Sequence, residues 1–142
     1  PVSEINSGGM LRVRIRFSLE HDLDDIEIVT GTHRTDFVYI SCASTRDFLS
    51  RAHFGRGAHE IHYIVPSFPL AAGIYSIRLV FLDKNWRQLF NGESLKTFTV
   101  RANRVESMNN QWKTVDLPSE FLVDGTHYAA PENHTLDSLA SK

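Results

Sequence analysis

Strict alternation of apolar and polar residues is the feature of this sequence that most constrains its fold. In LRVRIRF the apolar residues from Leu11 to Phe17 alternate with arginines, and GIYSIRLVFL alternates in the same way from Gly73 to Leu82. A period of two residues is typical of a β-strand with one face directed into a core. Glycine, asparagine and aspartate mark turns between such segments. The pattern predicts strands near residues 11–19, 25–30, 37–43, 59–65, 73–82 and 95–101.

Regularly spaced strands with almost no helical pattern predict an all-β fold. We expect an antiparallel β-sandwich of immunoglobulin-like or jelly-roll type. A length of 142 residues fits one domain, which we place over residues 1–142. Beyond Ala102 the alternation weakens, although residues 109–118 are typical of one more strand. We therefore interpret residues 103–142 as a less regular C-terminal extension, with a loosely ordered tail from Gly125.

Charge and cysteine content exclude several classes of site. Fifteen basic residues against seventeen acidic ones give a net charge of −2, so the composition does not indicate a nucleic-acid partner. Cys42 is the only cysteine, which excludes a disulfide within the chain and a cysteine-based zinc site. Alternation with Val38 and Ile40 predicts that Cys42 is an inert thiol on the inner face. The chain begins with Pro1, so we interpret it as a piece of a longer protein.

The sequence contains no recognisable catalytic constellation. No G-x-x-x-x-G-K-[ST] phosphate loop and no nucleophile elbow is present. His59 and His62 are three residues apart on a predicted strand, so they point to opposite faces and cannot share a metal ion. A hydrolase or metal enzyme on a sandwich scaffold is therefore the least favoured of three hypotheses. We expect no catalytic residue, no metal and no cofactor.

Three segments occur in an order that is similar to one known family. They are SGGMLRVRIRF, HYIVPSFPLAAGIYSIRLVFLD and LKTFTV. Together they resemble the C-terminal polysaccharide-binding domain of Wzt-type proteins, the nucleotide-binding subunits of bacterial ABC transporters that export O-antigen polysaccharide. The resemblance covers residues 7–101. The segment DKNWRQ departs from it, because Trp86 lies near the place where a glycine is common in that turn.

The resemblance implies a non-catalytic domain that binds the exported O-antigen polysaccharide, often at its non-reducing end, and so selects cargo for the transporter. It implies a cytoplasmic location at the inner face of the bacterial inner membrane. The implied partners are the ATPase domain of the same parent chain and the membrane subunit of the transporter. It also implies a homodimer, and we predict that the segment from Trp112 to Leu117 crosses to the second subunit.

A glycan site combines flat aromatic rings, which pack on sugar C–H faces, with groups that hydrogen-bond to hydroxyls. Two surfaces satisfy this in the sequence. The first places Arg14, Arg16 and His62 together, if the 11–19 strand lies beside the 59–65 strand. A solvated face with a carboxylate partner such as Glu60 is the alternative explanation for these arginines. This charged surface suits a glycan end that bears phosphate.

The second surface offers an aromatic residue with moderate polarity, from Tyr39, Ser76 and Arg78. We favour it narrowly, because it suits neutral sugar rings that stack on Tyr39. Trp112, alone in a polar stretch, is a further candidate for exposure or contact with a partner chain. The alternative function, from a different class, is an immunoglobulin-like dimerisation or scaffold domain without a ligand of its own.

Overall fold

The computed structural model describes residues 3–49, 52–102, 115 and 120–129. Within these ranges the only helical element is the single 3-10 turn η1, and no helix is long and apolar enough to cross a membrane. The elements, in chain order, are β1 (Glu4–Asn6), β2 (Leu11–Leu19), β3 (Leu23–Arg34), β4 (Tyr39–Ser44), η1 (Thr45–Asp47), β5 (Ala52–Phe54), β6 (Gly57–Val65), β7 (Gly73–Leu82), β8 (Gln88–Arg101), β9 (Glu120–Val123) and β10 (Thr126–Ala129).

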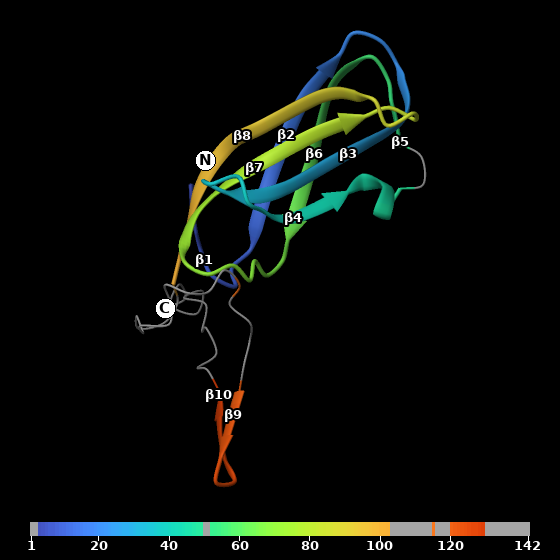
Figure 1. Cartoon of the computed structure of the whole chain (residues 1–142). Coiled ribbons are helices and arrows are strands. Elements are labelled where there is room, and N and C mark those ends of the chain that lie inside the picture. Colours follow the sequence, from blue (N-terminus) through green and yellow to red (C-terminus); the bar gives the residue numbers. More distant parts are fainter. Residues whose placement is uncertain (1–2, 50–51, 103–114, 116–119, 130–142) are drawn as a thin grey trace, which may run out of the picture.

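Two sheets form the body of the molecule. The larger sheet has the order β1-β8-β7-β3-β4, with β5 on one end of β3, and the smaller sheet is the antiparallel pair β2-β6. All described pairs are antiparallel except β1 with β8. Figure 1 shows β2 and β6 crossing one face of the larger sheet, while the β9-β10 hairpin lies apart from both sheets. The predicted all-β sandwich is therefore confirmed, with one parallel pair added.

The core lies between the two sheets and contains two adjoining groups of side chains. Alternate residues of β2 and β7 point into it, as the period of two predicts. Phe17 of the smaller sheet meets Phe81 of the larger one edge to face, with ring centroids 4.9 Å apart. The first group is Leu11, Phe68, Leu70, Tyr75, Ile77, Phe98 and Val100. The second is Ile15, Ile26, Ile28, Leu79 and Phe81.

Strand positions were predicted best where the alternation is strict. The bounds of β2 and β7 agree with the prediction, and β2 does lie beside β6. The strand expected at 95–101 begins instead at Gln88, because the NGE segment lies within β8 and is not a turn. The tail beyond Gly125 was expected to be loosely ordered, but residues 126–129 pair with β9. The predicted strand at residues 109–118 lies outside the described residues except for Val115, which bridges to Leu70.

The prediction for Cys42 was wrong. Its thiol is exposed on the outer face of β4 and does not lie in the core. The register between β3 and β4 shifts, so that Thr32 faces Ser41 while the next residue, His33, faces Tyr39. Ile40 is therefore an extra residue, a β-bulge, and it packs toward the core. One inserted residue reverses the phase of the alternation, which turns Cys42 outward.

Candidate binding site on the larger sheet

The outer surfaces of the two sheets differ in composition, and each contains one of the two predicted sites. We call the outer face of β3, β4 and β7 the aromatic face. We call the outer face of β2 and β6 the basic face. The aromatic face contains Glu27, Val29, Gly31, His33, Tyr39, Cys42, Ser44, Ser76, Arg78 and Val80. The basic face contains Arg12, Arg14, Arg16, Glu60, His62 and Ile64.

A hollow of about 220 Å³ opens on the aromatic face. Gly31 lines it, opposite Arg78 of β7 on one side and Cys42 of β4 on the other. A Cβ atom on Gly31 would lie 2.0 Å from the carbonyl oxygen of Ser41, so the close approach of β4 requires glycine here. The lining is Val29, Thr30, Gly31, Tyr39, Ile40, Ser41, Cys42 and Arg78.

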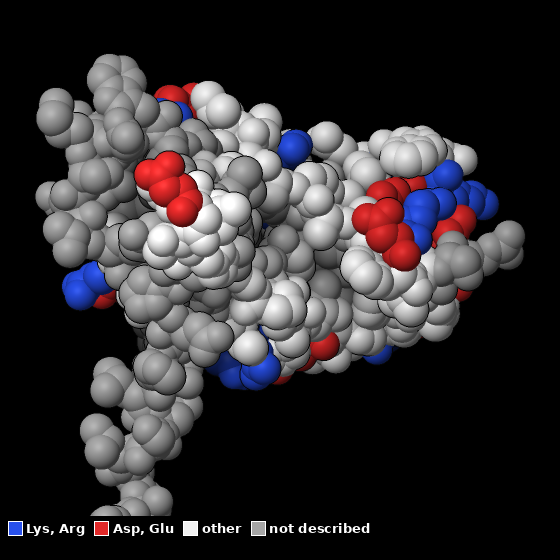
Figure 2. Space-filling model, turned by 90° about the horizontal axis from the view of Figure 1, so that it is seen from below, with Lys and Arg blue, Asp and Glu red and all other residues white. Residues whose placement is uncertain are grey.

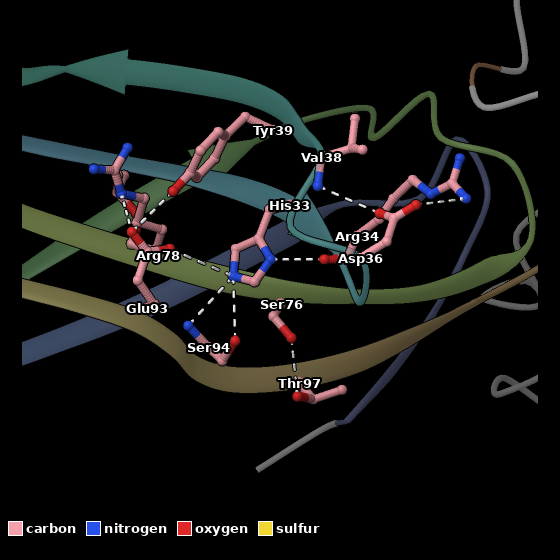
Figure 3. A network of polar contacts seen from close by, with 11 residues as sticks. His33, Arg34, Asp36, Val38, Tyr39, Ser76, Arg78, Glu93, Ser94 and Thr97 are labelled. Atoms are coloured by element: carbon pink, nitrogen blue, oxygen red, sulfur yellow. Dashed lines mark hydrogen bonds and ion pairs between the residues drawn. The ribbon is translucent and has the colours of Figure 1, made fainter.

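Tyr39 and Arg78, two of the predicted site residues, meet at the edge of this hollow (Figure 3). The guanidinium carbon of Arg78 lies 4.7 Å from the centre of the Tyr39 ring, a cation–π contact. The Tyr39 hydroxyl donates a hydrogen bond of 2.9 Å to Glu93 Oε1. That bond favours the protonated phenol and raises the pKa of Tyr39 above its ordinary value of 10.0. Tyr39 therefore remains a neutral hydrogen-bond donor at ordinary pH.

Arg78 combines an ion pair with a partly exposed side chain at the hollow. Its Nε lies 2.9 Å from Glu93 Oε1, close enough for an ion pair. The Nε atom itself is shielded from solvent, so a bound molecule would not reach it. The side chain is nevertheless 29% exposed and lines the hollow, and its guanidinium carries further N–H donors at the two terminal nitrogens.

Glu93 was not predicted as a site residue, and a large bulge in β8 brings it onto this face. Ile77 of β7 faces Lys96, whereas Leu79 faces Gly92, so three residues of β8 lie opposite Arg78 alone. Figure 3 shows Glu93 pointing from this bulge toward Arg78 and Tyr39. The sequence signal for it was present: the glycine and turn-forming residues of NGES interrupt a strand-like segment. We interpreted that signal as a turn between strands.

The side chain of His33 is only 1% exposed, and its ring lies against the aromatic residues of the site. Its Nδ1 lies 2.7 Å from the carbonyl oxygen of Arg34, and its Nε2 accepts a 3.3 Å hydrogen bond from the backbone N–H of Ser94. Both bonds together require the neutral ring with its proton on Nδ1. Phe37 stacks on this ring at 5.4 Å, and Tyr39 meets it edge-on at 6.0 Å. His33 thus fixes two aromatic rings at the surface.

Ser76, the third residue predicted for this surface, lies on the same face but is buried. Its hydroxyl lies 3.0 Å from the hydroxyl of Thr97, at hydrogen-bonding distance. Ser76 therefore helps to hold β8 against β7 and does not line the hollow. Trp112, the remaining aromatic candidate, lies outside the described residues.

The basic face matches its predicted arrangement. Arg14 lies opposite His62 and Arg16 opposite Glu60. Glu60 accepts hydrogen bonds from Arg16 Nε at 2.7 Å and from His62 Nε2 at 2.9 Å. These bonds, that from Arg16 first, hold the pKa of Glu60 below its ordinary value. Arg16 therefore has the carboxylate partner that the solvated-face interpretation requires.

An open depression of about 460 Å³ lies beside this pair. Its two rings, Phe17 and His59, stack on each other at 5.4 Å and are half-buried, so neither offers a free flat surface. Charges of both signs also mix elsewhere: in the view of Figure 2, most of the basic side chains lie next to acidic ones. Of the two predicted surfaces, the aromatic face is the one that combines an exposed ring with a partly exposed guanidinium beside it.

The structure is similar to the crystal structure of the C-terminal domain of Wzt. The match has a TM-score of 0.68 and 15% sequence identity, and it covers 83% of this chain and 72% of that chain. No protein-family model matches the sequence, and no curated protein matches it. At this level of identity the likeness concerns the fold. It confirms the fold that the sequence resemblance implied.

Proposed function

We propose, from a fold shared with the C-terminal domain of Wzt, that this chain is a non-catalytic carbohydrate-binding domain. Its ligand is bacterial O-antigen polysaccharide, bound at or near the non-reducing end, and binding selects cargo for an ABC transporter. The domain acts at the cytoplasmic side of the inner membrane, with the ATPase domain of its parent chain and the membrane subunit as partners. It forms a homodimer, to which the segment around Trp112 contributes.

One observation carries the proposal: the hollow that Tyr39 and Arg78 share. Tyr39 is 54% exposed, so its ring is available to pack on the C–H face of a sugar. The guanidinium of Arg78 lies next to that ring and is partly exposed, so its terminal N–H groups can donate to sugar hydroxyls. Glu93 balances the charge of Arg78, which favours neutral sugars over anionic ones.

The same hollow lacks the arrangement that sugar hydrolysis needs. A glycosidase places two carboxylates across one cleft. No carboxylate belongs to the lining among the described residues, and Glu93, which contacts two lining residues, is engaged by Arg78 and Tyr39. Binding without chemistry is therefore the function that this geometry supports best.

A glycan array of bacterial O-polysaccharides tests the proposal, with four variants of the full chain compared on any polysaccharide that binds. Tyr39→Ala and Arg78→Ala should each weaken binding by about 1–3 kcal/mol, by analogy with stacking of bases on aromatic residues. Arg14→Ala and His62→Ala serve as matched controls on the basic face and should bind as the parent does. Thermal unfolding of each variant verifies the fold.

If only the Arg14 and His62 variants lose affinity, the site lies on the basic face. If the array shows no binding at all, the scaffold function takes the place of the carbohydrate-binding one. Cys42 gives an independent measurement, because it is exposed, lines the hollow and is the only cysteine in the chain. Alkylation of its thiol should slow when a bound polysaccharide covers the hollow.

A further inference from the structure

Two hairpin turns of the larger sheet have the same unusual construction. In the β3–β4 turn, Arg34 N–H donates to the carbonyl of Val38 at 2.9 Å, and Phe37 N–H donates to the carbonyl of Arg34 at 3.0 Å. In the β7–β8 turn the equivalent bonds join Asp83 with Arg87 and Trp86 with Asp83, at 2.9 and 3.0 Å. This is a three-residue hairpin loop whose last residue is left-handed and is usually glycine.

Both turns place an aromatic residue at that left-handed position. Phe37 has φ of 62° and Trp86 has φ of 64°. A bulky residue with positive φ is a backbone outlier, and such strain is kept where the surrounding structure or the function requires it. The side chains are not buried in compensation: Phe37 is 59% exposed and Trp86 67% exposed. The core therefore does not explain either residue.

Each exposed ring is nevertheless held in place by a side chain that is itself fixed. Phe37 stacks on the buried imidazole of His33, with the two planes only 10° apart. Trp86 lies under the guanidinium of Arg46, 5.6 Å from its ring centre. Arg46 Nε is in turn hydrogen-bonded to the buried carboxylate of Glu27 at 3.1 Å. Rings positioned in this way present a flat surface to solvent at low conformational cost.

The two turns lie at opposite ends of the aromatic face, as Figure 1 shows. His33 and Glu27, which position the two rings, are six residues apart on β3, and both belong to the aromatic face. At a rise of about 3.3 Å per residue this separation is roughly 20 Å. The hollow with Tyr39 and Arg78 lies between them. A single sugar ring is too short to reach both ends.

The charges along this line are paired. Arg34 bonds to Asp36 at 3.2 Å in the first turn, Arg46 to Glu27, Arg78 to Glu93, and Arg87 to Asp83 at 3.1 Å in the second turn. These four arginines therefore give the surface directed donors without a net positive field. An uncharged chain of hydroxyl-bearing rings fits this surface better than a phosphorylated one.

We propose that Phe37 and Trp86 are platforms at the two ends of one extended site, and that its ligand is a neutral oligosaccharide segment several sugars long. The segment lies along β3 and β7, with one ring on Phe37, one on Trp86 and the intervening sugars over the hollow at Tyr39. This inference rests on the proposed carbohydrate-binding function and adds the length and charge of what is bound.

The test is the dependence of affinity on ligand length. The array polysaccharide that binds best is cut into disaccharides and into fragments of several repeats, and both are titrated against the full chain. Trp86→Gly should lower affinity for the long fragments roughly tenfold, as loss of one stacking platform would. It should leave affinity for the disaccharide unchanged. Glycine is chosen because it adopts the left-handed backbone of this position without strain. Tyr39→Ala should lower both, and Ile64→Ala, an exposed apolar residue on the basic face, should lower neither.

A second measurement leaves Trp86 in place. In a Trp112→Phe background Trp86 is the only tryptophan, so its fluorescence reports on its own environment. The emission should change on addition of long fragments and stay constant with the disaccharide. Equal loss of affinity at every length, or unchanged emission with long fragments that do bind, would overturn the extended site and leave the proposed function intact. Absence of any binding on the array would overturn both.

Discussion

β2 of the basic face and β7 of the aromatic face alternate equally cleanly in sequence, yet the site-like features gather on the aromatic face. Between β2 and β6 the register runs without a shift from Leu11 to Leu19. Long side chains there point outward into solvent and can form ion pairs across the ladder, as Arg16 and Glu60 do. On the larger sheet, bulges interrupt both the β3–β4 and the β7–β8 pairing. A regular ladder produces a solvated surface, whereas irregular register produces a hollow with side chains aimed into it.

The largest effect on stability is expected from the core between the two sheets. Phe81 belongs to the second core group and packs edge to face on Phe17, which lies against that group from the other sheet. Phe81→Ala should lower the free energy of unfolding by about 3–5 kcal/mol, through lost burial and the cavity left behind. Chemical denaturation measures it. An unchanged midpoint would mean that the two sheets do not pack on each other at this residue.

The next effect distinguishes the faces directly. Gly31→Ala places a methyl group against the backbone of Ser41, which cannot yield as a flexible side chain would. We expect a loss of about 1–3 kcal/mol in unfolding free energy, typical of overpacking, together with weaker glycan binding because the hollow is filled. Ser18→Ala, at an exposed position on the regular ladder of β2, should change stability by less than about 0.5 kcal/mol. Equal effects at the two positions would contradict the role given to the bulge.

A glycine–alanine comparison measures the strain in the β7–β8 turn. At Trp86, where φ is 64°, the glycine variant should be more stable than the alanine variant by about 1 kcal/mol, because only glycine adopts this backbone freely. At Ile64, in the regular β6 strand, the order should reverse, with glycine less stable by about 0.5–1 kcal/mol. Thermal unfolding of the four variants gives both differences. The same order at both positions would show that Trp86 is not strained.

The contrast between regular and bulged strand pairing also explains which features could be predicted from the sequence. The period of two was sufficient for β2 and β7 and for the inward side of Phe17 and Phe81. It also suggested Glu60 as a carboxylate partner for the arginines of β2, and the structure shows it bonded to Arg16. It was also sufficient to place Tyr39 and Arg78 on one surface.

The rest depends on inserted residues, which alternation cannot count. The extra Ile40 reversed the side assigned to Cys42. The bulge that carries Glu93 looked like the end of a strand. Phe37 was overlooked because nothing in the residue type signals a left-handed backbone at φ of 62°. Such features are determined by the neighbouring strands, so they become visible only when the sheet is assembled.

The smallest expected effect compares two acids, the exposed Glu60 on the basic face and the partly buried Asp83 in the β7–β8 turn. Glu60 on the basic face owes its lowered pKa first to the side chain of Arg16, whereas Asp83 in the turn that carries Trp86 owes it first to the backbone N–H of Arg87. A carboxyl whose pKa is lower in the folded state stabilises the fold above its unfolded pKa, ordinarily 4.5 for Glu and 3.8 for Asp, and loses that contribution as the pH falls through the folded value. The difference in melting temperature between the parent and either Glu60→Ala or Asp83→Ala should therefore be largest near neutral pH and shrink in acid.

Salt should separate the two acids, because an ion pair between exposed side chains is screened when the Debye length falls to about 3 Å in 1 M NaCl. Most of the Glu60 effect should then disappear. Most of the Asp83 effect should persist, since its Oδ1 accepts hydrogen bonds of 2.8 and 3.0 Å from the backbone N–H groups of Asn85 and Arg87. If salt removes both effects alike, the β7–β8 turn that contains Trp86 is stabilised by an ion pair, as the basic face is. Asp83 would then not differ from Glu60 in being stabilised by backbone hydrogen bonds instead of by a charged side chain.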